Sequence, residues 1–386
     1  MIPVSYTVRN IVNHKITSFL TILGISLVVF VFAGSLMLTR GLSDTLVASG
    51  SDGNVTLIRQ AAQTEVQSII YKDQAQIVRN FPEIMADENG APLITTEIYV
   101  IISRLNRKTG GEGNIAVRGI TNQSIAIRPN VHIVEGRMWT ESGSEILAGR
   151  QAAERFEGCG LGETVRFGMR DWTVVGIFDA GGSSVESELW CDVTQAGDAF
   201  DRPVYSSLTF RVSDTASFLA VKEKIEDDQR LKLEVNWEKE YYAKQSRSIS
   251  TFLNIAGSVI SIIFSLGAIV GAMITMYAAV ANRIKEIGTL RSLGFSRFSI
   301  LSSFLFESIL ISFIGGVIGV AGAYTLRYVK ISTTNWDTFS EIAFNFEISV
   351  PIITYTLIFA ILMGIIGGFL PAVRAARMKI VDSLRA

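Results

Sequence analysis

The sequence has very few of the residues that most enzymes and metal proteins depend on. Only two histidines, His14 and His132, and two cysteines occur among its 386 residues, which excludes zinc motifs of the H-E-x-x-H type. It contains neither a G-x-x-x-x-G-K-[ST] phosphate loop nor a G-x-S-x-G nucleophile elbow. The run GCGLGE ends in Glu163, where the dinucleotide-binding pattern requires glycine. We therefore expect no enzymatic activity, no bound cofactor and no metal, so that any energy the protein uses comes from a partner.

Charge is also scarce over long stretches of the chain. Hydrophobic residues make up 48% of the sequence and the mean hydropathy is +0.35, which is too apolar for an ordinary soluble protein. A membrane-spanning helix needs about 20 mainly apolar residues. A cleaved signal peptide is the alternative for the first apolar stretch, but the stretch is too long and no A-x-A pattern follows it. The sequence predicts four spans, at 16–40, within 248–282 after a short outward stalk, at 298–326 and at 348–372.

Positive charges collect in three segments that an even number of spans places on one side of the membrane. These are residues 1–15, 283–297 and 373–386, and the positive-inside rule makes their side cytoplasmic. Residues 41–247 then form a large extracytoplasmic domain, and 327–347 form a short extracytoplasmic loop. The net charge of −1 gives no indication of a nucleic-acid partner, and none is expected.

The large domain has a repeated pattern at its two ends. Alternating runs predict strands at 54–59, 92–103, 206–212 and 231–236, and helical spacing predicts helices at 73–81 and 215–228, the second opened by Asp214. Two β-α-β units, about 50–112 and 200–240, thus flank an insertion and indicate an α+β fold. Short alternating runs separated by Gly and Asn predict a β subdomain over 113–190, with a short helix at 149–156.

Cys159 and Cys191 lie within or beside this insertion. In an oxidising compartment they could form a disulfide, but their separation in the sequence is not an argument for one. A free, buried pair fits the sequence nearly as well.

Glu307 is the single acid inside the third predicted span. Because exposing a carboxylate to lipid is costly, such a residue indicates a functional or structural role. We expect Glu307 to bond to a neighbouring helix or to backbone and to fix packing, since the spans offer no second acid or base for a proton relay.

Small residues recur at G-x-x-x-G spacing in three of the spans. This spacing allows close helix packing, and a bundle of only four helices is poorly filled, so we expect dimerisation. The alternative is that glycine is simply common in transmembrane helices. The pairs are Gly267 and Gly271, Gly315 and Gly319, and Gly364 and Gly368.

The peptide ANRIKEIGTLRSLGFSRFSI, residues 281–300, lies between the second and third spans. An apolar stripe recurs every third residue at Ile284, Ile287, Leu290 and Leu293, whereas charges lie off the stripe at Arg283, Lys285, Glu286 and Arg291. Gly294 is placed as a helix-ending C′ glycine, followed by Phe295 for the apolar contact of the cap. The pattern predicts a short amphipathic helix that either rests on lipid or docks on a soluble partner.

This peptide resembles the coupling-helix signature of the FtsX/MacB-type ABC transporter permeases. The segments 8–29, 304–319 with Glu307, and 371–386 with Pro371, Arg374 and Arg377 are similar to other membrane motifs of that family. Within the outer domain, VRGI (117–120), VEGRMW (134–139) and LGETVRFGMRDWTVVGIF (161–178) are similar to its extracytoplasmic domain.

The resemblance implies an α-helical membrane protein with four transmembrane helices and a large α+β extracytoplasmic domain inserted between helices 1 and 2. It divides that domain into porter-like parts and an inserted β part. It also implies two permease protomers, identical or related, in the bacterial inner membrane with cytoplasmic termini, and ABC ATPase partners that hold ATP and Mg²⁺. Since the sequence opens with an amphipathic helix at 1–15, we expect a separate ATPase polypeptide. The implied ATPase-coupling residues are Arg283, Ile284, Lys285, Glu286, Ile287, Gly288, Leu290, Arg291, Leu293, Gly294 and Phe295.

The function implied is mechanotransmission. Closure of the ATPases moves the coupling helix, and the spans pass that movement to the outer domain, where a hydrophobic or amphipathic cargo such as a lipoprotein, lipid, peptide or drug is exported or extracted. A periplasmic adaptor is a further partner of such systems. The alternative is a non-transporting regulator that activates an extracytoplasmic hydrolase or senses peptides. A plain membrane-anchored scaffold would leave the 283–294 helix without a role.

Overall fold

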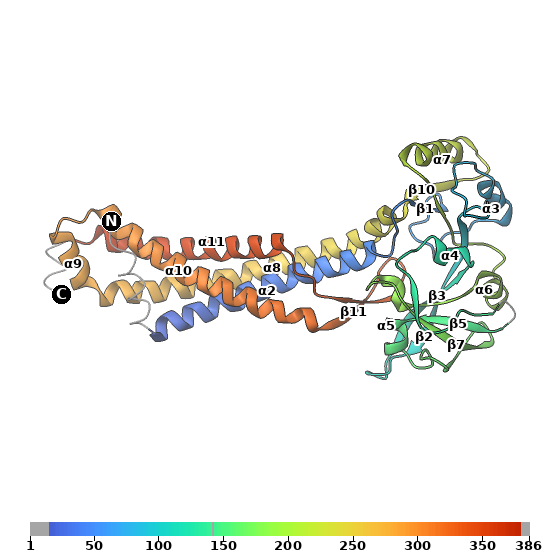
Figure 1. Ribbon diagram of the computed structural model, residues 1–386. Coiled ribbons are helices and arrows are strands. Elements are labelled where there is room, and N and C mark those ends of the chain that lie inside the picture. The colour runs from blue at the N-terminus through green and yellow to red at the C-terminus, as the bar shows by residue number, and fades with distance from the viewer. Residues whose placement is uncertain (1–14, 141–142, 380–386) are drawn as a thin grey trace. The chain divides into compact units, whose positions relative to one another are not determined.

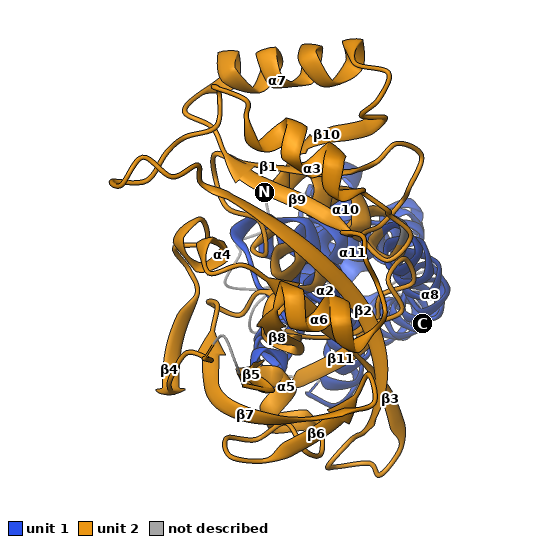
Figure 2. Ribbon diagram, turned by 90° about the vertical axis from the view of Figure 1, so that its right-hand side faces the viewer, with its two compact units in different colours: residues 1–41, 251–329, 345–386 blue, residues 42–250, 330–344 orange. Residues whose placement is uncertain are grey.

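The computed structural model describes residues 15–140 and 143–379. The chain divides into two compact units (Figure 2): unit 1 is made of residues 1–41, 251–329 and 345–386, and unit 2 of residues 42–250 and 330–344. The predicted N-terminal helix lies, except for Lys15, outside the described residues, as do residues 380–386 of the predicted tail.

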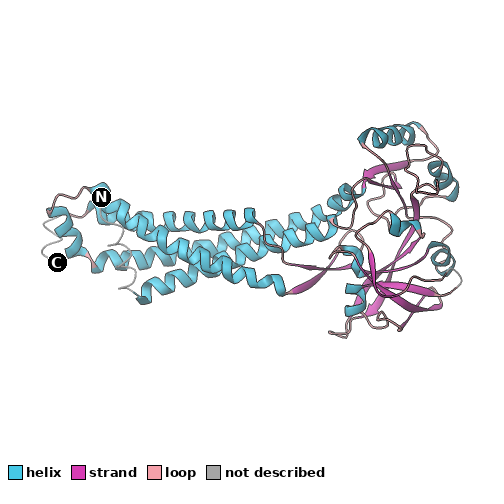
Figure 3. Ribbon diagram, in the orientation of Figure 1, coloured by secondary structure: helices cyan, strands magenta, loops and turns pink. Residues whose placement is uncertain are grey.

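Unit 1 is built from long apolar helices, which Figures 1 and 3 show side by side. Among the described residues, four helices are long and apolar enough to cross a membrane, which confirms the four predicted spans. Each contains a long, mainly apolar run, and in a hydrocarbon layer the backbone polar groups of such a run can bond only to one another within the helix. The helices are α2 (Lys15–Val47), α8 (Glu238–Asn282), α10 (Arg297–Tyr324, continued by the 3₁₀ turn η2 at Thr325–Tyr328) and α11 (Val350–Arg377), with the short α9 (Ile284–Ser292) between α8 and α10.

Glycines allow α10 to approach two other helices closely. A Cβ atom added at Gly319 would lie 2.6 Å from the backbone oxygen of Ser26 on α2, and one at Gly368 would overlap Ser308 on α10. Ser308 Oγ also donates a 2.7 Å hydrogen bond to the carbonyl of Gly364 on α11. Two of the three G-x-x-x-G pairs are therefore used for packing within the chain, as small residues at helix contacts usually are.

The first part of unit 2 is a β-α-β-β-α-β arrangement. Its strands pair antiparallel in the order β10-β1-β9-β2. Helices α3 and α7 contribute to the same apolar core as these strands, through Val78 and Val221 among others. Asp214 caps α7 by accepting the amide of Ser217 at 2.8 Å. The predicted strands and helices are confirmed as β1 (Asn54–Arg59), α3 (Lys72–Arg79), β2 (Ile94–Leu105), β9 (Ser207–Arg211), α7 (Thr215–Asp227) and β10 (Leu233–Trp237).

The second part of unit 2 is mainly β and shares strand β2 with the first. Residues 94–97 of β2 pair with β9, and residues 98–105 pair with β3, so the sheet path continues as β2-β3-β8-β5-β7-β4, with β6 beside β7. The helix predicted at 149–156 is confirmed as α5. The elements are β3 (Glu112–Ile120), α4 (Gln123–Ala126), β4 (His132–Gly136), β5 (Glu145–Gly149), α5 (Arg150–Arg155), β6 (Thr164–Phe167), β7 (Arg170–Asp179), the 3₁₀ turn η1 (Ser184–Ser187), β8 (Glu188–Asp192) and α6 (Val193–Ala199).

The segment predicted as a plain loop at 327–347 contains a hairpin, β11 (Lys330–Thr334) and β12 (Glu341–Asn345). The hairpin, except for Asn345, belongs to unit 2. Asn114 on β3 donates a 3.0 Å hydrogen bond to the carbonyl of Phe339, and the amide of Ala343 donates to Ser187 Oγ at 3.3 Å. Sequence reasoning missed this hairpin because its strands are short and one of them is almost entirely polar.

Candidate functional site

The α9 element begins and ends at defined points. Helix α8 ends at Asn282 and α9 begins at Ile284, so Arg283 alone forms the corner between them. At the other end Gly294 has φ +93°. Its amide donates to the carbonyl of Arg291 and the amide of Phe295 donates to that of Leu290, both at 3.2 Å. This is the Schellman pattern, and it confirms the predicted helix stop at Gly294.

The middle of the apolar stripe of α9 faces the interior of unit 1. Ile287 is only 1% exposed and lies in a core made by α8, α10 and α11, with Leu290 packed against it. The prediction of an apolar ridge free to dock is therefore wrong for these residues, because the corner at Arg283 folds the stripe back onto the helix ends. Lys285, Glu286 and Thr289 are exposed instead. So are Leu293, at 72%, and Phe298, at 71%, on either side of the turn that joins α9 to α10.

Arg283 is not on a charged, solvent-facing flank, as the sequence pattern indicated, but is buried. Its Nη1 lies 3.0 Å from Glu307 Oε2 on α10, and its Nε lies 3.2 Å from Glu286 Oε2. The guanidinium also stacks over the Phe304 ring, 4.8 Å from the centroid. Glu307 thus bonds to a neighbouring element, as predicted. Its partner is Arg283, which the sequence pattern placed among the solvent-facing charges of α9.

A small cavity adjoins Glu307. It has a volume of about 20 Å³, which is room for about one water molecule. Hydroxyl groups line it, and Thr21 Oγ1 of α2 lies 2.9 Å from Thr275 Oγ1 of α8. Several hydroxyl groups therefore line the same cavity as the carboxylate within a mainly apolar helix bundle.

The predicted tail residues lie at the end of α11. Pro371 is buried inside the helix, while Arg374 and Arg377 are exposed in its last turn, where positive charge complements the helix dipole. The Arg374 guanidinium lies 5.6 Å from the centroid of the Tyr277 ring on α8.

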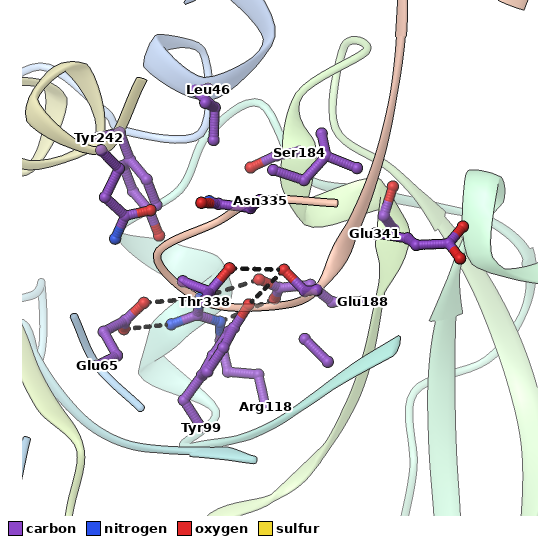
Figure 4. Close-up of a pocket in the computed structure, with 15 residues that line it drawn as sticks. Leu46, Glu65, Tyr99, Arg118, Ser184, Glu188, Tyr242, Asn335, Thr338 and Glu341 are labelled. Atoms are coloured by element: carbon purple, nitrogen blue, oxygen red, sulfur yellow. Dashed lines mark hydrogen bonds and ion pairs between the residues drawn. The ribbon is translucent and has the colours of Figure 1, made fainter. Parts of the chain in front are cut away.

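Unit 2 has a buried network of charged side chains, which Figure 4 shows around Arg118. Arg118 Nη1 lies 2.7 Å from Glu65 Oε1 and 2.6 Å from Glu97 Oε2, and its Nε lies 2.8 Å from Glu188 Oε2. A second guanidinium, that of Arg128, lies 2.8 Å from Glu97 and 3.0 Å from Glu238. All six side chains are buried.

Mutual attraction favours the charged forms of Glu97 and Arg118 in this network. Burial alone would raise the pKa of Glu97, but the guanidiniums of Arg128 and Arg118 hold it below its ordinary value. Burial likewise opposes the charge of Arg118, yet the carboxylates of Glu188 and Glu65 raise its pKa well above the usual range.

The network joins elements that are far apart in the sequence. Glu97 is on β2, Arg118 on β3 and Glu188 on β8, while Glu238 is the first residue of α8. Glu238 Oε2 also accepts hydrogen bonds from the amide of Ser51 and from Asn54 Nδ2, both at 2.9 Å. Both parts of unit 2 and the start of α8 are therefore tied to one centre. The sequence analysis missed it; the available signal was a single charge inside each of two otherwise uncharged strand segments, ITTEIYV and IAVRGI.

Both cysteines are free thiols in the structure, so the disulfide that the sequence left open is not formed there. Cys159 and Cys191 lie in the apolar core of the second part of unit 2. Burial raises the pKa of the Cys159 thiol to about 12 and that of Cys191 further still. Within the described ranges, no group of three His, Cys, Asp or Glu side chains could hold a metal ion.

Comparison with known families decides the identity of the chain. The model of the MacB-like periplasmic core domain matches residues 18–228, and that of the FtsX-like permease C-terminal domain matches residues 258–380. The chain belongs to the MacB/FtsX-like permease family. This permease is thus a multi-pass membrane protein with a sheet-rich domain inserted after its first span. Unit 2 contains most of the first match, and α9 lies within the second.

Individual relatives are distant. The permease is 22% identical over 401 residues to the macrolide export ATP-binding/permease protein MacB of Vibrio parahaemolyticus, which covers 96% of this chain and 58% of that protein. It is 26% identical over 296 residues to the uncharacterized ABC transporter permease YknZ of Bacillus subtilis, covering 71% and 70%. The crystal structure of the periplasmic region of MacB from Actinobacillus actinomycetemcomitans gives a TM-score of 0.37 at 15% identity, over 49% of this chain and 90% of that one. The permease spans between 36% and 58% of the length of the first three curated relatives.

Proposed function

We propose that this permease couples ATP hydrolysis by a separate ABC ATPase subunit, which holds ATP and Mg²⁺, to movement of its unit 2 on the outer side of the bacterial inner membrane. The observation that carries the proposal is α9. It is a short helix fixed at one end by a buried arginine and at the other by a Schellman cap. Its charged residues Lys285 and Glu286 are exposed, and so are two large apolar side chains beside the turn that follows it.

The surface offered to the ATPase consists of Lys285, Glu286, Thr289, Leu293 and Phe298, here named the coupling surface. Its two large apolar side chains are more than two-thirds exposed. Protein interfaces usually combine a few buried apolar anchors with a polar rim. Leu293 and Phe298 fit the role of anchors, and Lys285 and Glu286 fit that of the rim.

Chain connectivity supports transmission of movement to unit 2. The chain passes between the units at 41/42, 250/251, 329/330 and 344/345. The first two crossings lie inside the helices α2 and α8, and the other two lie at the ends of the β11–β12 hairpin segment. Displacement of the helices is thus applied to unit 2 at each of these covalent points, and cargo need not pass between the spans.

An open groove between α2 and α8 supports association with a second permease protomer, identical or related. The groove has a volume of about 420 Å³ and an apolar lining that includes Gly24, Gly267 and Gly271. A Cβ atom added at any of these three glycines would meet no atom within 4 Å. Only 22% of the apolar window of α8 is buried inside the chain, against 44% for α10 and for α11. The third G-x-x-x-G pair is therefore available to a partner helix.

The cargo that we propose is a hydrophobic or amphipathic molecule taken up at the outer face, such as a lipoprotein, lipid, peptide or drug. The names of two relatives, a macrolide exporter and a probable syringafactin exporter, support this class. Both chain termini are cytoplasmic in this arrangement, in agreement with the basic segments of the sequence. A periplasmic adaptor protein would bind unit 2.

The test uses Leu293→Asp in the full chain, purified in nanodiscs from its native host. Burying a charge at an interface anchor should weaken copurification of the ATPase and its stimulated hydrolysis by about tenfold or more. Leu219→Asp, the same change at an exposed position of α7 in unit 2, is the matched control and should change neither. The proposal would be refuted if the Leu293→Asp variant stimulated ATP hydrolysis as fully as the wild type. It would also be refuted if the wild-type chain associated with no ATPase.

Inactivating the partner's ATP hydrolysis separates transport from regulation. Cargo retained in the membrane supports export or extraction. Loss of an extracytoplasmic hydrolase activity without cargo retention supports the non-transporting regulator and contradicts the cargo proposal.

A further inference from the structure

We propose that Arg283 and Glu307 are a positioning pair that ties the α8–α9 corner to α10 and so determines whether movement of α9 reaches the spans. This inference deepens the proposed function and, for its second test, rests on it. Both residues are 5% exposed, and their charged atoms lie 3.0 Å apart.

The location of Arg283 makes it a pivot. It is the single residue between two helices, with φ −116° and ψ 20°, outside the helical values of its neighbours. Its amide donates to the carbonyl of Val280 and its carbonyl accepts from Ile287, at 3.2 and 3.0 Å. Apolar packing of Ile287 also holds α9 against the other helices, but it is the side chain of Arg283 that ties the corner itself, at the first turn of this nine-residue helix, to a neighbouring helix.

The guanidinium is held from several sides, and these contacts differ in strength. Glu286 lies on α9 itself and its side chain is 57% exposed, so this contact contributes little and cannot tie α9 to another helix. The Phe304 ring and Glu307 both belong to α10. A buried, charge-assisted hydrogen bond is strong and direction-specific. The attachment of the Arg283 guanidinium to α10 therefore depends mainly on Glu307.

Helix α10 is well placed to pass on the load. It packs against α2 at Gly315 and Gly319 and against α11 through Gly316. Ser308, the residue after Glu307, donates its 2.7 Å hydrogen bond to α11. A displacement applied at Glu307 is therefore delivered to a helix in close contact with two other spans, through packed groups that resist deformation.

The first test needs no ATPase. Hydrogen exchange of the α9 amides is measured by mass spectrometry on the full chain in nanodiscs. Glu307→Gln and Arg283→Gln should each speed exchange of peptide 284–292 at least about tenfold, since each removes one charge of the buried ion pair and so loosens the attachment of the corner to α10. Lys285→Gln, the same loss of charge on the exposed side of α9, should stay within about twofold of wild type.

The double variant Arg283→Gln/Glu307→Gln guards against simple misfolding. It carries no uncompensated buried charge, so it should fold even if the single variants do not. Its α9 should still exchange faster than that of the wild type because the tie is gone. Wild-type protection of α9 in Glu307→Gln or in the double variant would overturn the inference.

The second test separates transmission from a merely structural role. In nanodisc complexes with the copurified ATPase and MgATP, Glu307→Gln should retain the bound ATPase, because the coupling surface is unchanged. Stimulated hydrolysis should fall about tenfold. Glu307→Asp, which keeps the charge, should restore a large part of it. Full stimulation in a variant whose α9 exchanges rapidly would show that the pair does not transmit movement. If no ATPase binds the wild-type chain, the proposed function fails, while the exchange measurement still decides whether the pair positions α9.

Discussion

The two units hold their elements together by different chemistry. Unit 2 buries two guanidiniums among four carboxylates, and each guanidinium contacts at least two of them. In unit 1 the helices meet mainly through glycine and apolar side chains, and the ion pair between Arg283 and Glu307 stands at the edge of the α9 core. Several ion pairs thus hold the same elements of unit 2 together, whereas the position of α9 depends on a small number of contacts.

This difference fits the transmission of movement that we propose. Buried ionic networks are poor sources of net stability, but breaking one leaves charges that no solvent can reach. Such a network resists partial rearrangement and lets unit 2 move as a body. Helix contacts made by small residues involve no such penalty and allow sliding. We expect the deformation to occur in unit 1.

The largest expected effect is that of Arg118→Met, which would leave three carboxylates buried without their shared cation. The free energy of unfolding of unit 2 should fall by about 3–5 kcal/mol. All five tryptophans lie in unit 2, so urea unfolding followed by tryptophan fluorescence reports on this unit alone. Arg137→Met, which removes an arginine from the exposed pair with Glu145, is the control and should hardly change the midpoint. Equal midpoints for the two variants would mean that the network does not hold unit 2 together.

The next effect compares two glycines of unit 1. Gly319→Leu would force α10 away from α2, where Ser26 O lies 2.6 Å from an added Cβ, and overpacking of this kind costs about 1–3 kcal/mol. A Cβ atom added at Gly267 would meet no atom within 4 Å. Gly267→Leu should therefore leave the thermal stability unchanged, as measured by circular dichroism of the helices. It should lower the dimer fraction measured by mass photometry. A dimer fraction unaffected by Gly267→Leu would place the protomer contact elsewhere.

The sequence was sufficient where local signals decide the structure. The four spans follow from apolar length, the strands and helices at the two ends of unit 2 follow from period, and the end of α9 follows from Gly294. Each of these signals lies within a few residues of the feature it predicts.

Features that depend on contacts between distant residues could not be predicted in this way. Arg283 lies off an apolar stripe, and only packing against α10 shows that its side chain points inward to Glu307. The members of the unit 2 network, at positions 65, 97, 118, 128, 188 and 238, follow no period. The hairpin at 330–345 is held by side chains from other strands, such as Asn114. In each case a residue far away in the sequence determines where the side chain or strand lies, and no local pattern indicates that residue.

A smaller effect is expected from a helix cap in unit 2. Asp192 accepts hydrogen bonds from the amides of Thr194 and Gln195 at 2.9 and 3.1 Å and begins α6. Asp192→Ala should lower the stability of unit 2 by about 1 kcal/mol, whereas Asp198→Ala, an exposed change on the same helix, should not. Tryptophan fluorescence in urea measures both. If Asp192→Ala lowered the free energy of unfolding as much as Arg118→Met does, the buried network would not contribute more to the stability of unit 2 than a single local contact.

The smallest expected effect concerns the two thiols, and it tests the rigidity of unit 2 without disturbing it. With a pKa of about 12, Cys159 is a thiolate at pH 8 in a fraction on the order of 10⁻⁴, and both thiols lie in the apolar core. Maleimide should therefore leave the native wild-type chain unlabelled and should modify both thiols after unfolding, with or without reductant. In a Leu293→Cys chain the added thiol, at an exposed site of unit 1, should react readily and serves as the internal standard. Because reaction of the core thiols requires opening of unit 2, a native labelling rate near that of the exposed added thiol would mean that the core of unit 2 is open to the reagent most of the time, and the contrast between a rigid and an adjustable unit would be lost.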